Sequence, residues 1–153
     1  MSIMLGTTLY SMTNEWLAGQ YTLGSLIDEV GRRGIGPGVE VIGFQSLRGF
    51  PNKVSDEDLR TLREAIDRNG LVPTSLASNA DIALRAGQWM DADRSVEYMR
   101  PQIELAGELG FPVVRTQLGL TPEVLEKVEP IAAKAGVKLG RRFTRPKVRT
   151  PRR

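Results

Sequence analysis

The chain has 153 residues, of which 41% are hydrophobic and 25% are charged, the mixture of an ordinary globular domain with one buried core. It contains no cysteine and no histidine, which excludes disulfides, thiolate chemistry, a Ser-His-Asp triad and an HExxH zinc site. No apolar run is long enough to span a bilayer and no signal peptide is visible, so we expect a cytoplasmic protein that does not contact membranes.

The first elements alternate between strand and helix. Residues Met4–Met12 form an apolar, threonine-containing run that predicts a strand, and Asn14–Tyr21 is typical of a loop. Thr22 then begins a helix with leucine, isoleucine and valine at helical spacing, and Gly34 marks its end. A second strand is expected over Gly38–Gln45.

The middle of the chain contains the clearest helix. Ser55 is a good N-cap for it, three acids follow in the first turn, and an Asn-Gly pair closes it. Residues Leu71–Ser78 predict a third strand, although Pro73 argues against a central position because proline lacks a ladder donor. A helix over at least Asp93–Leu109 follows, with a kink or a break expected at Pro101.

The last elements repeat the same unit. Val113–Gln117 predicts a fourth strand, and Thr121-Pro122-Glu123 opens a helix that runs to about Ala135. Gly136–Gly140 begins a fifth strand. This strict alternation predicts an α/β fold of parallel βα repeats with right-handed crossovers.

The charge is divided unevenly. Residues 1–140 carry a formal charge of −4, and residues 141–153 carry +7 from six arginines and one lysine. We expect this tail to be disordered. Either it is accidental sequence from a shifted reading frame, which the Arg/Pro/Thr composition favours, or it is a functional basic arm. The acidic body gives no electrostatic reason to expect nucleic-acid binding.

Candidate ligand-binding residues follow the strands. Ligands of parallel α/β folds bind beyond the carboxyl ends of the strands, where this chain places hydroxyls, amides and two arginines suited to a polyol or sugar phosphate. Solvated loop residues are the alternative interpretation. The candidates are Tyr10, Ser11, Gln45, Arg48, Ser75, Ser78, Asn79, Asp81, Arg115 and Gln117. Glu40, between two valines, is either a polar residue of a barrel interior or the partner of a helix residue in a salt bridge.

Several segments together resemble a known family. "LGTTLYSMTNEW", "GVEVIGFQSLRGFP", "LVPTSLASNADIAL", "LGFPVVRTQLG" and "IAAKAGVKLG" are similar to the start of a sugar phosphate isomerase/epimerase of the xylose isomerase-like TIM-barrel superfamily, over about residues 3–140. The resemblance implies a (β/α)8 barrel that uses a divalent metal (Mg, Mn or Zn) on a small sugar or polyol. It carries substrate contacts over to Gln45, Arg48, Asn79, Arg115 and Gln117.

The resemblance stops where the family would place its metal ligands, on the fifth to eighth strands. Gly140 is followed by Arg141, Arg142 and Phe143 instead of an acid-bearing strand, so we assign no catalytic residue and no metal ligand. We expect residues 1–140 to form an incomplete TIM barrel of about four βα units plus the start of a fifth strand, and residues 141–153 to form a separate basic tail. Such a protein is expected to be inactive alone.

Two alternatives remain open. One is a half barrel that dimerises and binds a polyol without chemistry, and the other is nucleic-acid contact through the tail. An incomplete barrel leaves open sheet edges and an uncovered inner face, on which we expect Val41, Leu76 and Val114. Poor solubility, partial disorder or self-association through the edges would follow.

Overall fold

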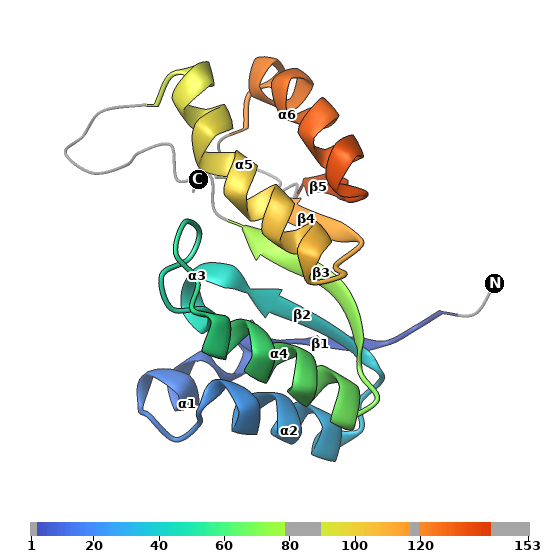
Figure 1. The fold of residues 1–153 in the computed structure, drawn as a ribbon. Coiled ribbons are helices and arrows are strands. Elements are labelled where there is room, and N and C mark those ends of the chain that lie inside the picture. The colour runs from blue at the N-terminus through green and yellow to red at the C-terminus, as the bar shows by residue number, and fades with distance from the viewer. Residues whose placement is uncertain (1–2, 79–89, 117–119, 142–153) are drawn as a thin grey trace, which may run out of the picture.

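The computed structural model describes residues 3–78, 90–116 and 120–141. One five-stranded parallel sheet, with strand order β1-β2-β3-β4-β5, forms the centre (Figure 1). Its strands are β1 (Gly6–Thr8), β2 (Gly38–Ile42), β3 (Val72–Ser78), β4 (Val113–Thr116) and β5 (Lys138–Arg141). The helical elements are η1 (Leu9–Met12), α1 (Thr13–Leu17), α2 (Leu23–Arg33), α3 (Gly43–Ser46), α4 (Asp56–Arg68), α5 (Ala92–Glu108) and α6 (Pro122–Ala135).

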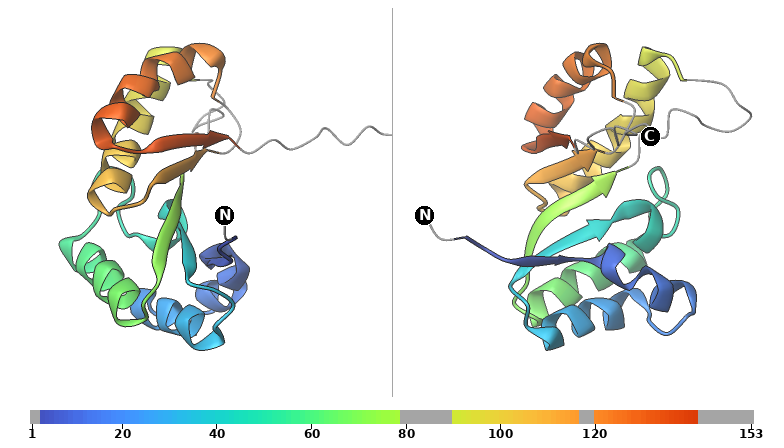
Figure 2. Two further views of the ribbon diagram at one scale, coloured as in Figure 1. Left: turned by 90° about the vertical axis from the view of Figure 1, so that its right-hand side faces the viewer. Right: turned by 180° about the vertical axis from the view of Figure 1, so that it is seen from behind.

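The predicted fold class is confirmed, because helices alternate with parallel strands along the described chain. The four long helices α2, α4, α5 and α6 lie along one side of a curved sheet (Figure 2). Each strand pairs with its neighbour in the sequence. This is the arrangement of an open part of a (βα) barrel.

The start of the chain differs from the sequence prediction. Only Gly6–Thr8 of the expected strand is paired, because the Thr8 hydroxyl accepts a hydrogen bond from the Tyr10 backbone N–H at 3.3 Å and caps η1. The expected loop after it contains α1. Threonine is as compatible with a cap as with a strand, so composition alone did not separate the two.

The second strand is three residues shorter than expected. It ends at Ile42, and the Leu47 N–H donates to the Gly43 carbonyl at 3.0 Å to close the short helix α3. The ring of Phe50 lies 2.4 Å from the place where a Cβ on Gly43 would be. Only glycine therefore allows the loop to fold back over this turn.

Three helix starts, at Thr22, Ser55 and Thr121, were predicted correctly. The Thr22 side chain accepts a hydrogen bond from the Ser25 N–H in a capping box, and the Ser55 side chain accepts one from the Asp58 N–H. The Thr121 side chain accepts from the Val124 N–H, and Pro122 follows it as the first residue of α6. Gly34 ends α2 in the left-handed conformation, with φ of 60°.

Pro73 and Pro101, two of the prolines inside the elements, are tolerated by their surroundings. Pro73 lies in the central strand β3, beside a register shift at Val39 and Glu40 of β2, and the Thr74 hydroxyl donates to the Val39 carbonyl at 2.9 Å. The hydroxyl of Thr74, at the bulge, thus satisfies the Val39 carbonyl beside the proline. Helix α5 continues through Pro101 as one helix, so the break is absent, and a kink there stays a prediction.

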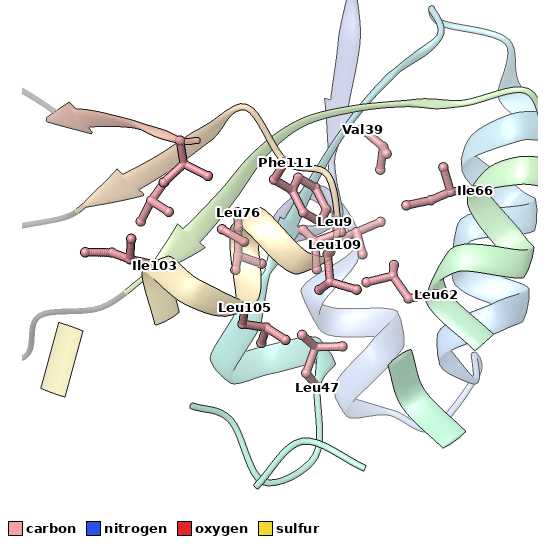
Figure 3. Close-up of a cluster of buried hydrophobic side chains, with 14 of the residues drawn as sticks. Leu9, Val39, Leu47, Leu62, Ile66, Leu76, Ile103, Leu105, Leu109 and Phe111 are labelled. Atoms are coloured by element: carbon pink, nitrogen blue, oxygen red, sulfur yellow. The ribbon is translucent and has the colours of Figure 1, made fainter. Parts of the chain in front are cut away.

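A single core fills the space between the sheet and the helices. Strand residues such as Val39 and Leu76 lie among Leu62 and Ile66 of α4 and Ile103 of α5 (Figure 3). The expectation that the uncovered face carries Val41, Leu76 and Val114 is wrong: all three are fully buried and belong to this core.

Within the described part of the chain, β1 and β5 are the outer strands of the sheet, and each pairs on one side. Self-association through these edges stays a prediction. No described helix combines the length and the apolar character needed to span a bilayer. The expected boundary between a domain at 1–140 and a tail also stays a prediction, because residues 142–153 lie outside the described ranges.

Candidate functional site

The face of the sheet opposite the core carries a polar cluster. Four neighbouring strands each contribute one residue to it: Thr8 of β1, Glu40 of β2, Ser75 of β3 and Arg115 of β4. Thr8, Glu40 and Ser75 are direct partners in the strand register. Because side chains alternate along a strand, the burial of Val39 and Val41 against the helices turns Glu40 to the other face.

Glu40 is the centre of this cluster. The Arg115 guanidinium holds both of its carboxylate oxygens, with Nε on Oε1 and Nη2 at 3.2 Å from Oε2. The Ser75 hydroxyl donates to Oε1 at 2.8 Å, and the Thr8 hydroxyl forms a further hydrogen bond. The side chains of Glu40 and Arg115 are 15% and 25% exposed, so the pair is largely shielded from water.

The surroundings keep Glu40 ionised. Burial by itself raises the pKa of the Glu40 carboxyl, but hydrogen bonds from Arg115, Thr8 and Ser75 outweigh burial and hold the pKa below its ordinary value. Glu40 is therefore a fixed negative charge near neutral pH and not a proton donor.

Arg115 still has hydrogen-bonding capacity. A guanidinium carries five N–H bonds, and the Glu40 carboxylate takes one from Nε and one from Nη2. Within residues 3–78, 90–116 and 120–141 the remaining N–H bonds of Arg115 have no assigned acceptor. A hydroxyl or carbonyl oxygen beside the sheet would find donors already held in place.

A pocket of about 710 Å³ lies on the helix side, by the loop after β2. Its walls come from α1, from the first turns of α2 and α4, and from residues 44–50. Two predicted ligand residues, Gln45 and Arg48, line it, together with Trp16, Phe44 and Phe50. We call it the rim pocket.

Arg48 is paired with acids of α4. Its Nη2 lies 2.8 Å from Oδ1 of Asp58 and 3.0 Å from Oε2 of Glu57, and its backbone N–H donates to Oδ2 of Asp58 at 2.9 Å. The Arg48 side chain is 70% exposed and that of Asp58 is 8% exposed. The hydrogen bonds from Arg48 lower the pKa of Asp58, and the acids raise the pKa of Arg48. Arg48 thus fastens the pocket wall to α4.

The five predicted site residues do not all meet. Arg115 belongs to the strand cluster, whereas Gln45 and Arg48 line the rim pocket. Asn79 and Gln117 lie outside the described residues. The sequence interpretation left the role of Glu40 open and gave Thr8 no role, although the alternation of Glu40 with two valines was the available signal.

The described residues do not fit the divalent metal that the family resemblance implies. No group of three or more acidic side chains gathers within the described ranges. Glu40, the best-placed carboxylate of the strand cluster, already has hydrogen-bond donors on both of its oxygens.

Comparison by sequence finds relatives among deglycosidases. The chain is 48% identical over 134 residues to a C-glycoside deglycosidase alpha subunit of Arthrobacter globiformis, covering 88% of this chain and 36% of that protein. It is 39% identical over 136 residues to a 3'-dehydrocarminate deglycosidase alpha subunit of a Microbacterium species, covering 89% and 39%. The chain thus spans little more than a third of these relatives. No protein-family model matches it.

Comparison by structure confirms the TIM-barrel resemblance at the level of the fold. D-psicose 3-epimerase crystallised in the presence of D-fructose matches with a TM-score of 0.61 and 15% identity, over 90% of this chain and 51% of the other. A xylose isomerase domain protein of Planctomyces limnophilus matches with a TM-score of 0.54 and 16% identity, over 75% and 46%. The described residues have the fold of about half of such a barrel.

Proposed function

We propose that this chain forms the N-terminal half of the barrel of a deglycosidase alpha subunit and that its polar strand cluster binds the sugar part of a glycoside. The high identity to such subunits along nearly the whole described fold is the observation that supports the proposal most strongly. It favours cleavage of a glycoside over the isomerase or epimerase reaction that the family resemblance implied.

The strand cluster has the chemistry that a sugar requires. A sugar hydroxyl or carbonyl accepts hydrogen bonds well from a guanidinium whose position is fixed, and Glu40 fixes Arg115 from two oxygens. The hydroxyls of Thr8 and Ser75 lie beside the pair. In this proposal Arg115 contacts the sugar and Glu40 is a positioning residue.

Catalysis would need more than these residues. The match covers about a third of each relative, so we propose that the rest of a barrel supplies the catalytic groups and any metal, either as a continuation or as a separate polypeptide. The relatives are called alpha subunits, which supports association with a second subunit. By itself the described half barrel would bind a sugar without turnover.

A chimera tests the proposal. The matching 134 residues of the Arthrobacter globiformis subunit would be replaced by those of this chain, and release of the aglycone from a C-glycoside measured with the native partner subunit. We expect activity within about tenfold of the parent enzyme, a barrier change of about 1.4 kcal/mol.

The matched variants separate binding from folding. In the chimera, Arg115→Met should raise KM or lower kcat/KM by tenfold or more, and Arg115→Lys should restore only part of it, because lysine lacks the planar guanidinium. A chimera that melts cooperatively and assembles with the partner, yet is inactive on every C-glycoside offered, would overturn the proposal.

A further inference from the structure

We propose that the rim pocket is a second binding site, which takes a planar, hydroxylated aromatic group such as the aglycone of the glycoside. This inference rests on the proposed function for the identity of the ligand. The pocket itself is an observation independent of the strand cluster, because it lies on the helix side of β2.

The two sites are linked by one short segment. Glu40 lies within β2, the strand ends at Ile42, and Phe44 and Gln45 of α3 follow it into the pocket wall. Ligands of parallel α/β folds bind at the carboxyl ends of strands, and this loop lies at such an end.

Aromatic side chains characterise the pocket. Trp16, Phe44 and Phe50 come from α1, α3 and the following loop, and Phe44 is 47% exposed. Aromatic faces of this kind bind planar rings by offset stacking or edge-to-face contact. A volume of about 710 Å³ falls within the usual size of small-molecule sites.

Unpaired polar atoms supply orientation. The Gln45 amide is held at 3.0 Å from the Thr13 hydroxyl, and its buried Nε2 has no hydrogen-bond partner among the residues described. The same holds for the buried hydroxyl of Ser46. Buried polar atoms without partners are uncommon in folded proteins, and the hydroxyls of a ligand would satisfy them.

The charged side chains that line the rim pocket favour an uncharged ligand. The charged side chains of the lining are Arg48, Glu57 and Asp58, which leave one net negative charge. The guanidinium is already engaged by both acids. An uncharged phenol therefore fits this pocket better than an aromatic carboxylate.

The wall is formed in advance. Arg48 fixes one side to α4, the Phe50 ring packs over Gly43, and Gly49 turns with φ of 78° while its carbonyl accepts from the Lys53 N–H at 2.8 Å. A rigid wall reduces the entropy lost on binding.

Calorimetric titration of luteolin, a planar hydroxylated flavone, into the 153-residue protein at pH 6 tests the inference. We expect saturable binding that weakens by tenfold or more in Phe44→Ala. Ile35→Ala, which removes another half-exposed apolar side chain outside the pocket, should change the affinity less than twofold. A second readout needs no change in the pocket: in Trp89→Phe, Trp16 is the only indole, and its emission should respond to luteolin with the same affinity.

Absence of saturable binding, or equal affinities in wild type and in a folded Phe44→Ala, would overturn the inference. Trp16 emission that does not change when luteolin is added would also overturn the inference. The chimera distinguishes this failure from failure of the proposed function. An active chimera in which luteolin binding ignores Phe44 leaves the function standing and removes the rim site. An inactive chimera whose luteolin binding depends on Phe44 would overturn the proposed function and leave the rim site standing.

Discussion

Glu40 and Arg115 form an ion pair between two strands that are separated by a third. Glu40 lies on β2 and Arg115 on β4, and β3 runs between them in the sheet. Ser75 of β3 donates to the same carboxylate. Three strands are thus tied together by side chains, in addition to their backbone ladders.

Removing Glu40 should leave a shielded positive charge without its partner. We expect Glu40→Ala to lower the free energy of unfolding by about 1–3 kcal/mol, less than for a fully buried pair because both groups retain some exposure. Urea denaturation followed by circular dichroism would measure this. In a double-mutant cycle with Arg115→Met, a coupling below about 0.5 kcal/mol would show that the pair contributes little.

Stability should fall in acid through Asp58. The folded state holds the pKa of Asp58 below its ordinary value, first through the Arg48 side chain. The unfolded chain therefore binds a proton more readily, and the contribution is complete above about pH 5 and is lost as pH falls through the folded pKa. Melting temperatures between pH 3 and pH 6 should vary less in Asp58→Asn. Arg48→Met should also make the melting temperature depend less on pH. If neither variant changes the slope of melting temperature against pH, the Asp58–Arg48 pair is not the source of the acid sensitivity.

Gly49 should resist substitution for a steric reason beyond its backbone angle. A Cβ there would lie 1.9 Å from the Lys53 carbonyl oxygen, whereas at Gly19, with φ of 69°, no atom lies within 4 Å. Gly19→Ala should cost about 1 kcal/mol from the angle alone. Gly49→Ala should cost at least about 2 kcal/mol more. Thermal and urea unfolding of both variants would test the difference, and equal losses would contradict the described clash.

Gly107 should reverse the usual preference for alanine in helices. A Cβ on Gly107 of α5 would approach the Ala135 carbonyl oxygen of α6 to 2.4 Å, while at Gly24 of α2 the nearest atoms are side-chain atoms at 3.3 Å and beyond. We expect Gly107→Ala to destabilise by about 1–3 kcal/mol. Gly24→Ala should be neutral or stabilising by up to about 1 kcal/mol. A stabilised Gly107→Ala would show that α5 and α6 separate easily.

Periodicity and caps predicted the order of the elements well. Thr22, Ser55 and Thr121 act as N-caps where the sequence placed them, because a cap depends on local chemistry alone. The short helices α1 and α3 were missed. Each is a turn or so in length, and α3 depends on Phe50 folding back over Gly43, a contact that no local pattern contains.

The site was predicted less completely than the fold. Arg115 and Gln45 were chosen for their place at strand ends, which topology determines. Whether Arg48 meets a ligand or an acid depends on Asp58, ten residues further along the chain, and only the folded backbone brings the two together. The side of the sheet on which Val41 and Leu76 lie was also assigned wrongly, because alternation gives two faces without saying which one the helices cover.

The strands have the same order in the sheet as in the chain, and this affects how the protein can fold during synthesis. Each strand of the described sheet after β1 pairs with the strand that left the ribosome just before it. Each new βα unit can dock onto a surface already made, at the low loop-closure cost of sequence-adjacent segments. A nascent chain could thus assemble these units one after another while later residues are still being translated.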